Sequence, residues 1–210
     1  MDLEQYIGKL ESASAINWRE NSLDSVKNIW VNINQKTITN WLVIDKNVNN
    51  QIIFYLARSE RFTGDLNKGI LLIGNTGSGK TRMMKSLSLA MGYLHRFRFL
   101  IYSGNEIEKA FRNETEIESQ LTQKMFGIDD LGEEHNKVKV YGTDINVGVE
   151  VLSNRYNLMI KNGSLTFATT NLTRAMLLKK YGARIDSRID EMFNVFTVTG
   201  DDLRKKITHE

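Results

Sequence analysis

The sequence predicts an α/β fold in which helices flank a five-stranded, mainly parallel sheet. Short, continuous apolar runs alternate along the chain with longer segments whose apolar residues recur at helical spacing. Continuous apolar runs are typical of strands that are buried on both faces, as parallel strands are. In addition, the glycine-rich segment GNTGSGKT, residues 74–81, directly follows one apolar run and opens one helical segment.

The first part of the chain is polar and contains the three tryptophans, at positions 18, 30 and 41. We expect two short helices there, over residues 2–12 and 22–32. A third helix is expected over residues 45–62, because its apolar residues fall on one helical face. The tryptophans either anchor a partner protein or pack these helices onto the rest of the molecule.

The strands and further helices follow in alternation. In chain order we expect strands over residues 69–73, 97–102, 126–129, 165–169 and 194–199. Between them we expect a helix over residues 80–92, one that begins with residues 106–111, and one over residues 145–159.

Composition limits the class of protein. The 210 residues are 41% hydrophobic and 25% charged with a net charge of +3, which fits one globular domain. Since the chain has no cysteine, a disulfide framework, a thiolate nucleophile and a cysteine-ligated zinc site are excluded. No apolar run approaches the roughly 18 residues that span a bilayer, and the first residues lack the apolar core of a secretory signal. We therefore expect a cytoplasmic protein without a membrane partner.

Residues 74–81 match the phosphate-loop pattern G-x-x-x-x-G-K-[ST] in full. Glycines allow the backbone to curl so that N–H groups face phosphate oxygens, and the helix N-terminus adds a positive dipole end. Lys80 would reach the β- and γ-phosphates of ATP, and the Thr81 hydroxyl would ligate Mg²⁺. The alternative, a turn without function, is disfavoured by the flanking strand and helix. The predicted ATP-binding residues are Gly74, Asn75, Thr76, Gly77, Ser78, Gly79, Lys80 and Thr81.

The second motif is FGIDDLGEE, residues 126–134, in which apolar residues lead into two aspartates. Open α/β sheets bind ligands at the carboxyl ends of their strands, where this pair falls. Asp129 would hold Mg²⁺ through water, and Asp130 would orient or deprotonate the attacking water. Alone, two aspartates after a strand also form common turns. Gly127 departs from a clean apolar run.

With these motifs the chain resembles an AAA+ ATPase, in particular the DnaC-type bacterial and phage helicase loaders and the related IstB-type transposition ATPases. The resemblance covers residues 45–210 and follows the family's order. It rests on KGILLIGNTGSGKT (68–81), IDDLGEE (128–134), LSNRYN (152–157), TFATTNL (166–172) and YGARIDSRIDEMF (181–193). It implies an AAA+ core over residues 46–210 without a full C-terminal lid, and a short helical segment, residues 1–45, that docks a partner.

The resemblance also implies roles for single residues. Asn171, or its neighbour Thr170, takes the place of sensor 1, which polarises the attacking water or touches the γ-phosphate. Arg188, with Arg184 one helical turn earlier, takes the place of the arginine finger, which reaches the nucleotide of a neighbouring subunit. Arg204 resembles sensor 2, which senses the γ-phosphate in cis. From the residues alone, these arginines would be surface ion pairs with Asp186, Asp190 and Asp202.

Two departures from the family bear on these roles. Many AAA+ proteins have glutamate at the position of Asp130, whose side chain is one methylene shorter, and Glu134 is a nearby alternative base. The absence of cysteine excludes the zinc-bearing module that some loaders carry. By family analogy alone, Val43 or Ile44 contacts adenine.

Basic and aromatic residues alternate in HRFRFLIY, residues 95–102. On a strand, this pattern places Arg96 and Arg98 on one face and the phenylalanines on the other. The cations could bind a single-stranded DNA backbone together with Lys109 and Arg112, or they could be the solvated side of an aromatic core face.

The expected function is that of an ATPase in DNA replication, which uses ATP and Mg²⁺ to load or remodel a hexameric replicative helicase on single-stranded DNA. ATP binding would favour self-association, and hydrolysis would release the partner. An IstB-like partner of a transposase shares the same core. A P-loop small-molecule kinase and a non-catalytic nucleotide-dependent scaffold are further alternatives.

Overall fold

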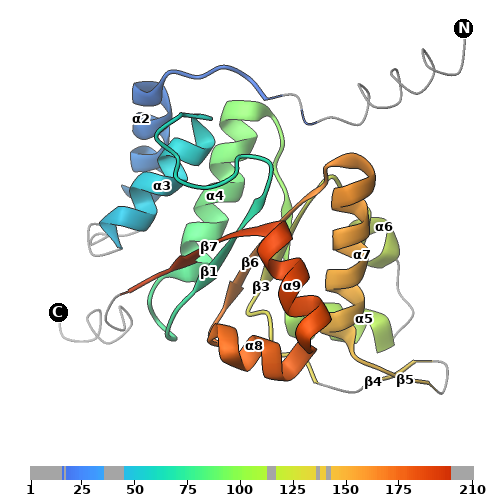
Figure 1. Cartoon of the computed structure of the whole chain (residues 1–210). Helices are drawn as coiled ribbons and strands as arrows, with labels where there is room; N and C mark the ends of the chain where they lie inside the picture. Colours follow the sequence, from blue (N-terminus) through green and yellow to red (C-terminus); the bar gives the residue numbers. More distant parts are fainter. Residues whose placement is uncertain are drawn as a thin grey trace, which may run out of the picture.

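The computed structural model of the chain describes residues 16, 18–35, 45–112, 117–135, 138–140 and 143–199 (Figure 1). Several predictions lie outside these residues. They are the helix over residues 2–12, the environment of Trp41, the adenine contact at Val43 or Ile44, and Arg204 with its neighbour Asp202.

The main sheet has five parallel strands, in the order β2-β3-β6-β1-β7. The strands are β1 (Gly69–Ile73), β2 (Leu100–Ser103), β3 (Met125–Asp129), β6 (Leu165–Thr170) and β7 (Phe193–Thr197). The order places β6 between β1 and β3, so the segments that follow these three strands emerge side by side at one edge of the sheet. The predicted α/β class with a parallel five-stranded sheet is thereby confirmed.

Helices cover both faces of this sheet (Figure 1). One face carries α2 (Leu23–Gln35), α3 (Lys46–Leu56) and α4 (Lys80–His95). The other carries α5 (Gly104–Arg112), α6 (Ile117–Leu121), α7 (Val147–Asn162), α8 (Arg174–Tyr181) and α9 (Ala183–Met192). A small antiparallel sheet of β4 (Val138–Val140) and β5 (Thr143–Ile145) lies between β3 and α7 in the chain.

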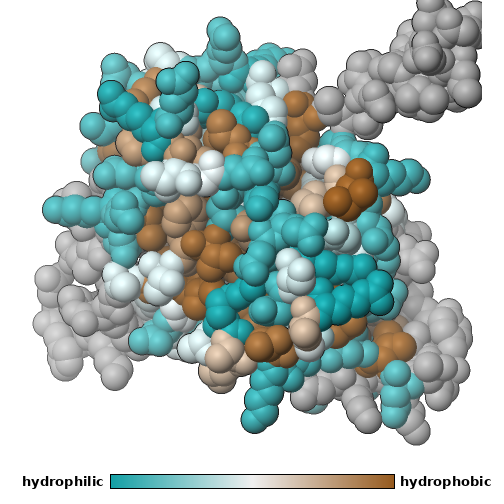
Figure 2. Space-filling model, viewed as in Figure 1, coloured by the Kyte–Doolittle hydropathy of each residue, from teal (hydrophilic) through white to brown (hydrophobic). Residues whose placement is uncertain are grey.

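The two faces have separate hydrophobic cores because side chains alternate along each strand. In β1, Ile70 and Leu72 pack with α2, α3 and α4, whereas Leu71 and Ile73 pack with the helices of the other face. All five residues of β1 are buried, which explains its unbroken apolar run. On the face shown in Figure 2, hydrophilic residues predominate and hydrophobic ones are scattered among them.

Side-chain caps begin several helices of this proline-free chain. Asp45 accepts hydrogen bonds from the Asn47 and Val48 backbone N–H groups at the start of α3, and Asn146 accepts one from Val149 at the start of α7. A capping box of Ser103 and Glu106 begins α5, since each side chain bonds the other residue's N–H. None of the helices in the described ranges is long and apolar enough to cross a bilayer.

Some predicted bounds are wrong, and chain reversals account for the differences. The third helix ends at Leu56 rather than residue 62, because the chain turns at Arg58, whose φ is +52°. Helix α4 ends at His95 rather than residue 92, and the next residue, Arg96, caps it with a φ of +62°. Consequently β2 begins at Leu100, and residues 97–99 are not part of a strand. The fifth strand of the main sheet spans Phe193–Thr197 rather than 194–199.

Helix α2 is part of the folded core. Trp30 of α2 is fully buried and donates from its indole N–H to Asn49 of α3 at 3.3 Å. The Trp18 ring packs edge-on against His95, with the Arg58 guanidinium 4.4 Å from its ring centre. The expectation that the tryptophans pack onto the rest of the molecule is confirmed for these two.

A buried arginine joins α7 to the start of two strands. Arg155, in the LSNRYN segment, is fully buried and donates to three backbone carbonyls and one hydroxyl. The acceptors are Leu121 O, Gln123 O, Leu165 O and Thr166 Oγ1, at 2.6 to 3.0 Å. Burial lowers the pKa of Arg155 to about 10. Arg155 is therefore a structural residue with its donors satisfied inside the protein.

Candidate functional site

The glycine-rich loop connects β1 to α4. Gly77 and Gly79 have φ angles of +83° and +91°, a region in which L residues with a side chain are strained, so these glycines permit the loop's curl. Lys80, the first residue of α4, is 4% exposed, and its ammonium donates to the loop carbonyls of Gly74 and Asn75 at 2.8 Å. The sequence pattern therefore has the strand–loop–helix setting that it predicts.

A hydroxyl and a carboxylate meet beside this loop. The Thr81 hydroxyl donates to Asp129 Oδ1 at 2.9 Å, and the Thr169 hydroxyl donates to the same oxygen at 2.5 Å. Thr81 is the second residue of α4, Asp129 ends β3, and Thr169 lies near the end of β6. Three adjacent elements thus place two oxygen ligands of the kind that Mg²⁺ prefers next to the phosphate loop.

Asn171 links the lysine of the loop to the second aspartate. Its Oδ1 accepts a hydrogen bond from the Lys80 ammonium at 2.8 Å, and its Nδ2 donates to Asp130 Oδ1 at 3.3 Å. Asn171 directly follows β6, which lies between β1 and β3. The strand order therefore brings together three residues that are separated by up to 91 positions in the chain. Thr170, weighed as the alternative to Asn171, instead donates to the Leu131 carbonyl at 2.6 Å and is fully buried.

The backbone at Asp130 has an unusual conformation. Its φ is +54°, and its N–H donates to the Thr169 hydroxyl at 2.9 Å. The turn is closed by the Glu133 N–H, which donates to the Asp130 carbonyl at 3.1 Å, and Leu131 N–H donates to the Thr169 carbonyl at 2.8 Å. These contacts hold the turn against β6 and direct the Asp130 carboxylate toward Asn171.

The two glutamates after the aspartates have different surroundings. Glu133 is exposed beside the site, and partial burial together with the charges of Asp130 and Asp129 raises its pKa, while a hydrogen bond with Asn171 acts in the opposite direction. Glu134, the alternative base of the sequence analysis, is buried. Its carboxylate accepts hydrogen bonds from the Gly132 N–H and the Tyr181 hydroxyl and does not face the phosphate loop. Glu133 was not among the residues that the sequence placed beside the site. Its position three residues after Asp130 could have indicated this, because the first and fourth residues of a turn lie close together.

The arginines of α9 lie near α7. Arg188 donates to the Ser153 hydroxyl at 3.0 Å, and its guanidinium lies 4.6 Å from the centre of the Tyr156 ring. Arg184, one turn earlier, is exposed. The acids Asp186 and Asp190 of α9 were expected to pair with these arginines. They pair with Arg174 instead, whose guanidinium lies 3.0 Å from the Asp186 carboxylate and 2.8 Å from the Asp190 carboxylate.

The four basic residues considered for DNA contact do not form one cluster. Arg96 and Arg98 are exposed just before β2, and Phe99 between them and the strand is buried, so cations and aromatics do face opposite sides although residues 97–99 are not a strand. Lys109 and Arg112 lie on α5, which follows the other end of β2. Arg112 donates twice to Glu108, at 2.8 and 2.9 Å.

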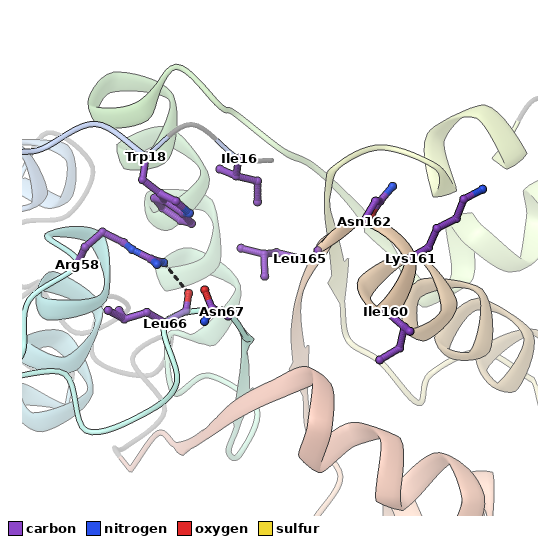
Figure 3. A pocket seen from close by; sticks show the side chains of 10 residues that line it. Ile16, Trp18, Arg58, Leu66, Asn67, Ile160, Lys161, Asn162 and Leu165 are labelled. Carbon is purple, nitrogen blue, oxygen red and sulfur yellow. Dashed lines mark hydrogen bonds between the residues drawn. The ribbon is translucent and has the colours of Figure 1, made fainter. Parts of the chain in front are cut away.

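A separate hollow of about 440 Å³ lies at the opposite end of the sheet (Figure 3). Figure 3 shows Trp18 and Arg58 on one side and Ile160 and Lys161, from the end of α7, on the other. Arg58 donates to the Leu66 carbonyl at 2.6 Å. Because the hollow is lined by the first residue of β6, it is not continuous with the site beyond the last residue of that strand.

Comparisons with known proteins identify the fold. No protein-family model matches the sequence, and no curated protein matches it either. Among solved structures, the chain is similar to the DnaC helicase loader, with a TM-score of 0.56 and 20% identity over 73% of this chain and 89% of that one. It is similar to DnaI, with a TM-score of 0.59 and 19% identity over 84% of this chain and 92% of that one.

A third similar structure is the replication initiator DnaA bound to AMPPCP and single-stranded DNA, with a TM-score of 0.55 and 12% identity over 78% of this chain and 50% of that one. At these identities the similarity establishes the fold. The chain has the α/β fold that these structures share, and its resemblance to DnaC-type proteins is confirmed at the level of the fold.

Proposed function

We propose that this protein is an ATPase of DNA replication that loads or remodels a hexameric replicative helicase on single-stranded DNA. The observation that carries the proposal is the direct contact of Lys80 with Asn171, of Asn171 with Asp130, and of Thr81 with Asp129. These five residues lie at the ends of β3 and β6 and at the start of α4, which the phosphate loop joins to β1, and each has the chemistry that the binding or hydrolysis of ATP requires.

The loop fits a triphosphate with Mg²⁺. The Lys80 ammonium is buried among carbonyls of its own loop, so a phosphate oxygen would replace contacts to neutral oxygens with contact to an anion. The Ser78 hydroxyl is also buried and has no hydrogen-bond partner among the described residues. Thr81 and Asp129 would hold Mg²⁺, which neutralises charge on the phosphates when it is bound.

Asp130 and Asn171 are suited to handling the attacking water. The Asn171 amide would hold a water molecule by hydrogen bonding, and the Asp130 carboxylate would accept its proton. Arg188 and Arg184 would act on the nucleotide of a neighbouring copy in an ATP-bound assembly, and Arg204 would act in cis. A guanidinium suits this task because it stays charged and presents a fork of donors to phosphate oxygens.

The partners follow from the proteins of similar fold. Two of these are a helicase loader and DnaI, and the third is described as bound to single-stranded DNA. Residues 1–45 are proposed to dock the helicase, and Arg96, Arg98, Lys109 and Arg112 are proposed to contact DNA. Since α2 is packed into the core, a docking surface within that segment would be the exposed side of α2 or the residues around it.

ATP turnover tests the site. We expect Lys80→Ala to abolish turnover measured with and without single-stranded DNA and helicase, because the β- and γ-phosphates lose their cation. Lys85→Ala, an exposed lysine on the same helix, is the matched control and should retain turnover. Turnover that survives Lys80→Ala would refute the site, and phosphoryl transfer to a metabolite without any response to DNA would instead support a kinase.

A pull-down tests the partner. The cognate helicase should be retained by the protein in one nucleotide state more than in the other. Deletion of residues 1–15 should weaken retention and leave Trp18 and α2 in place, whereas removal of all 45 residues would also strip buried Trp30 from the core. Absence of helicase binding in every nucleotide state would refute the loading function while leaving the ATP site untouched.

A further inference from the structure

A buried carboxylate joins the loop after β3 to the end of α8. The Glu134 side chain is 2% exposed, and its Oε2 accepts a hydrogen bond from the Gly132 backbone N–H at 2.8 Å. Its Oε1 accepts one from the Tyr181 hydroxyl at 2.5 Å and lies 3.6 Å from the Lys180 ammonium. Burial raises the pKa of Tyr181, with the Glu134 carboxylate acting in the same direction, so the hydroxyl stays a donor. Both carboxylate oxygens are therefore bound within the protein.

Two glycines at helix starts leave room for this carboxylate. A Cβ on Gly104, the first residue of α5, would lie 2.9 Å from Glu134 Oε2. A Cβ on Gly148, in the first turn of α7, would lie 2.6 Å from Glu134 Oε1 and 2.5 Å from the Tyr181 ring. Such contacts are too short for a side chain unless the neighbour shifts, so a residue with a Cβ at either position would displace the Glu134 carboxylate, and at Gly148 also the Tyr181 ring. The carboxylate is thus enclosed by the loop after β3, α5, α7 and α8.

The two ends of this contact lead to the nucleotide site and to the arginines of α9. On one side, the five-residue turn from Asp130 to Glu134 includes Gly132, whose φ is +104° and whose N–H is held by Glu134. On the other side, Tyr181 is the last residue of α8 and is separated from α9 by Gly182 alone. Because packed elements shift as units, a movement of the turn would displace the junction of α8 and α9.

We propose that Glu134 is a positioning residue that couples the turn carrying Asp130 to α8 and α9, and so transmits nucleotide binding to Arg184 and Arg188. The proposal rests on the ATP site proposed above and assigns Glu134 no role as a base, since its oxygens face α8 and Gly132. It extends that function by naming the contact, between Glu134 and Tyr181, through which nucleotide binding would change the position of the arginines of α9.

Hydrogen–deuterium exchange of the full chain with AMPPCP and Mg²⁺ tests the coupling directly. In the wild type, AMPPCP should slow exchange of peptides covering residues 174–192. Glu134→Gln replaces one of the two acceptor oxygens with an NH2 group, which cannot accept a hydrogen bond, so the Gly132 N–H and the Tyr181 hydroxyl can no longer both donate to this side chain. The response should therefore fall by about half or more, with AMPPCP affinity within about threefold of the wild type. Tyr181→Phe removes the hydrogen bond from the Tyr181 hydroxyl, keeps the bond from the Gly132 N–H, and should lose the response in the same way. Glu60→Gln, an exposed glutamate, is the matched control and should respond as the wild type does.

Turnover gives a second readout. Glu134→Gln should lower kcat about tenfold or more, with KM within about twofold, because the groups at Asp130 remain present but are misplaced. If the nucleotide response of α8 and α9 persists in both variants, or in Tyr181→Phe alone should Glu134→Gln not fold, the coupling is refuted. A wild type that binds AMPPCP without any response in residues 174–192 also refutes it. A wild type that binds no AMPPCP refutes the ATP site itself.

Discussion

Replacement of Arg155 by leucine should destabilise the protein by about 3 kcal/mol. The buried carbonyls of Leu121 and Leu165 would lose this donor, and a buried group left without a partner costs about 1–3 kcal/mol, whereas the carbonyl of the exposed Gln123 can bond water instead. Leucine would recover about 2 kcal/mol through its own burial. The burial that lowers the pKa of Arg155 to about 10 also means that removing its charge recovers part of the desolvation cost, which keeps the net loss below the sum over the carbonyls.

Urea unfolding followed by circular dichroism measures this loss. With a slope of about 2–3 kcal/mol per molar for a protein of this size, the midpoint should fall by about 1–1.5 M at an unchanged slope. Arg61→Leu, an exposed arginine, should shift the free energy of unfolding by no more than about 0.5 kcal/mol. If Arg155→Leu is as stable as the wild type, or more stable, leucine packs well enough to replace the four hydrogen bonds and the reasoning fails.

Three further outcomes are expected. Burial alone would raise the pKa of Glu108, but hydrogen bonds from His135 and a neighbouring arginine lower it to about 2 from 4.5, so its stabilisation is present above pH 4.5 and lost as the pH falls toward 2; Glu108→Gln should flatten the melting temperature across that window, and an unchanged slope would contradict this. Gly127→Val should lower the urea midpoint by an amount equivalent to about 1–3 kcal/mol, because a Cβ would lie 2.9 Å from Ile101 Cγ1; a midpoint equal to that of the wild type would show that β2 can yield. Asn171→Ala should lower ATP turnover about 100-fold while binding of a fluorescent ATP analogue is largely retained, and equal losses of both would limit Asn171 to orienting Lys80.

The centre of the sheet could be predicted because its strands are buried on both faces. The run over residues 69–73 is apolar at nearly every position for that reason, and β6 is likewise buried along its whole length. Residues 97–99 were misplaced because their aromatic side chains pack onto the core from a loop as well as they would from a strand. Helix α8 has only two buried residues, Leu177 and Tyr181, so its apolar periodicity was too weak to predict it.

In the candidate site, too, some contacts could be predicted from local sequence patterns and others could not. The phosphate loop and the aspartates after β3 are local patterns. The contacts of Thr81 with Asp129 and of Asn171 with Asp130 lie where those patterns and the strand order would put them. The contact between Glu134 and Tyr181 joins residues 47 positions apart through the packing of α8, which no local pattern encodes. The same holds for Gly104 and Gly148, because the side chains that approach them, Glu134 at both and Tyr181 at Gly148, come from distant parts of the chain.

The left-handed backbone at Asp130 bears on which residue this position can accept. Among residues with a side chain, aspartate and asparagine enter that region of φ several times more readily than most others. The shorter acid therefore suits the turn as well as the proposed role of Asp130 as a base. Asparagine would keep the turn and an oxygen for the Asn171 amide while removing the charge, whereas glutamate would lengthen the acid on a backbone that disfavours it. Under the proposed function, Asp130→Asn should therefore hold ATP without hydrolysing it and keep the phosphate loop unaltered, so it is the variant of choice for trapping the proposed nucleotide-bound assembly.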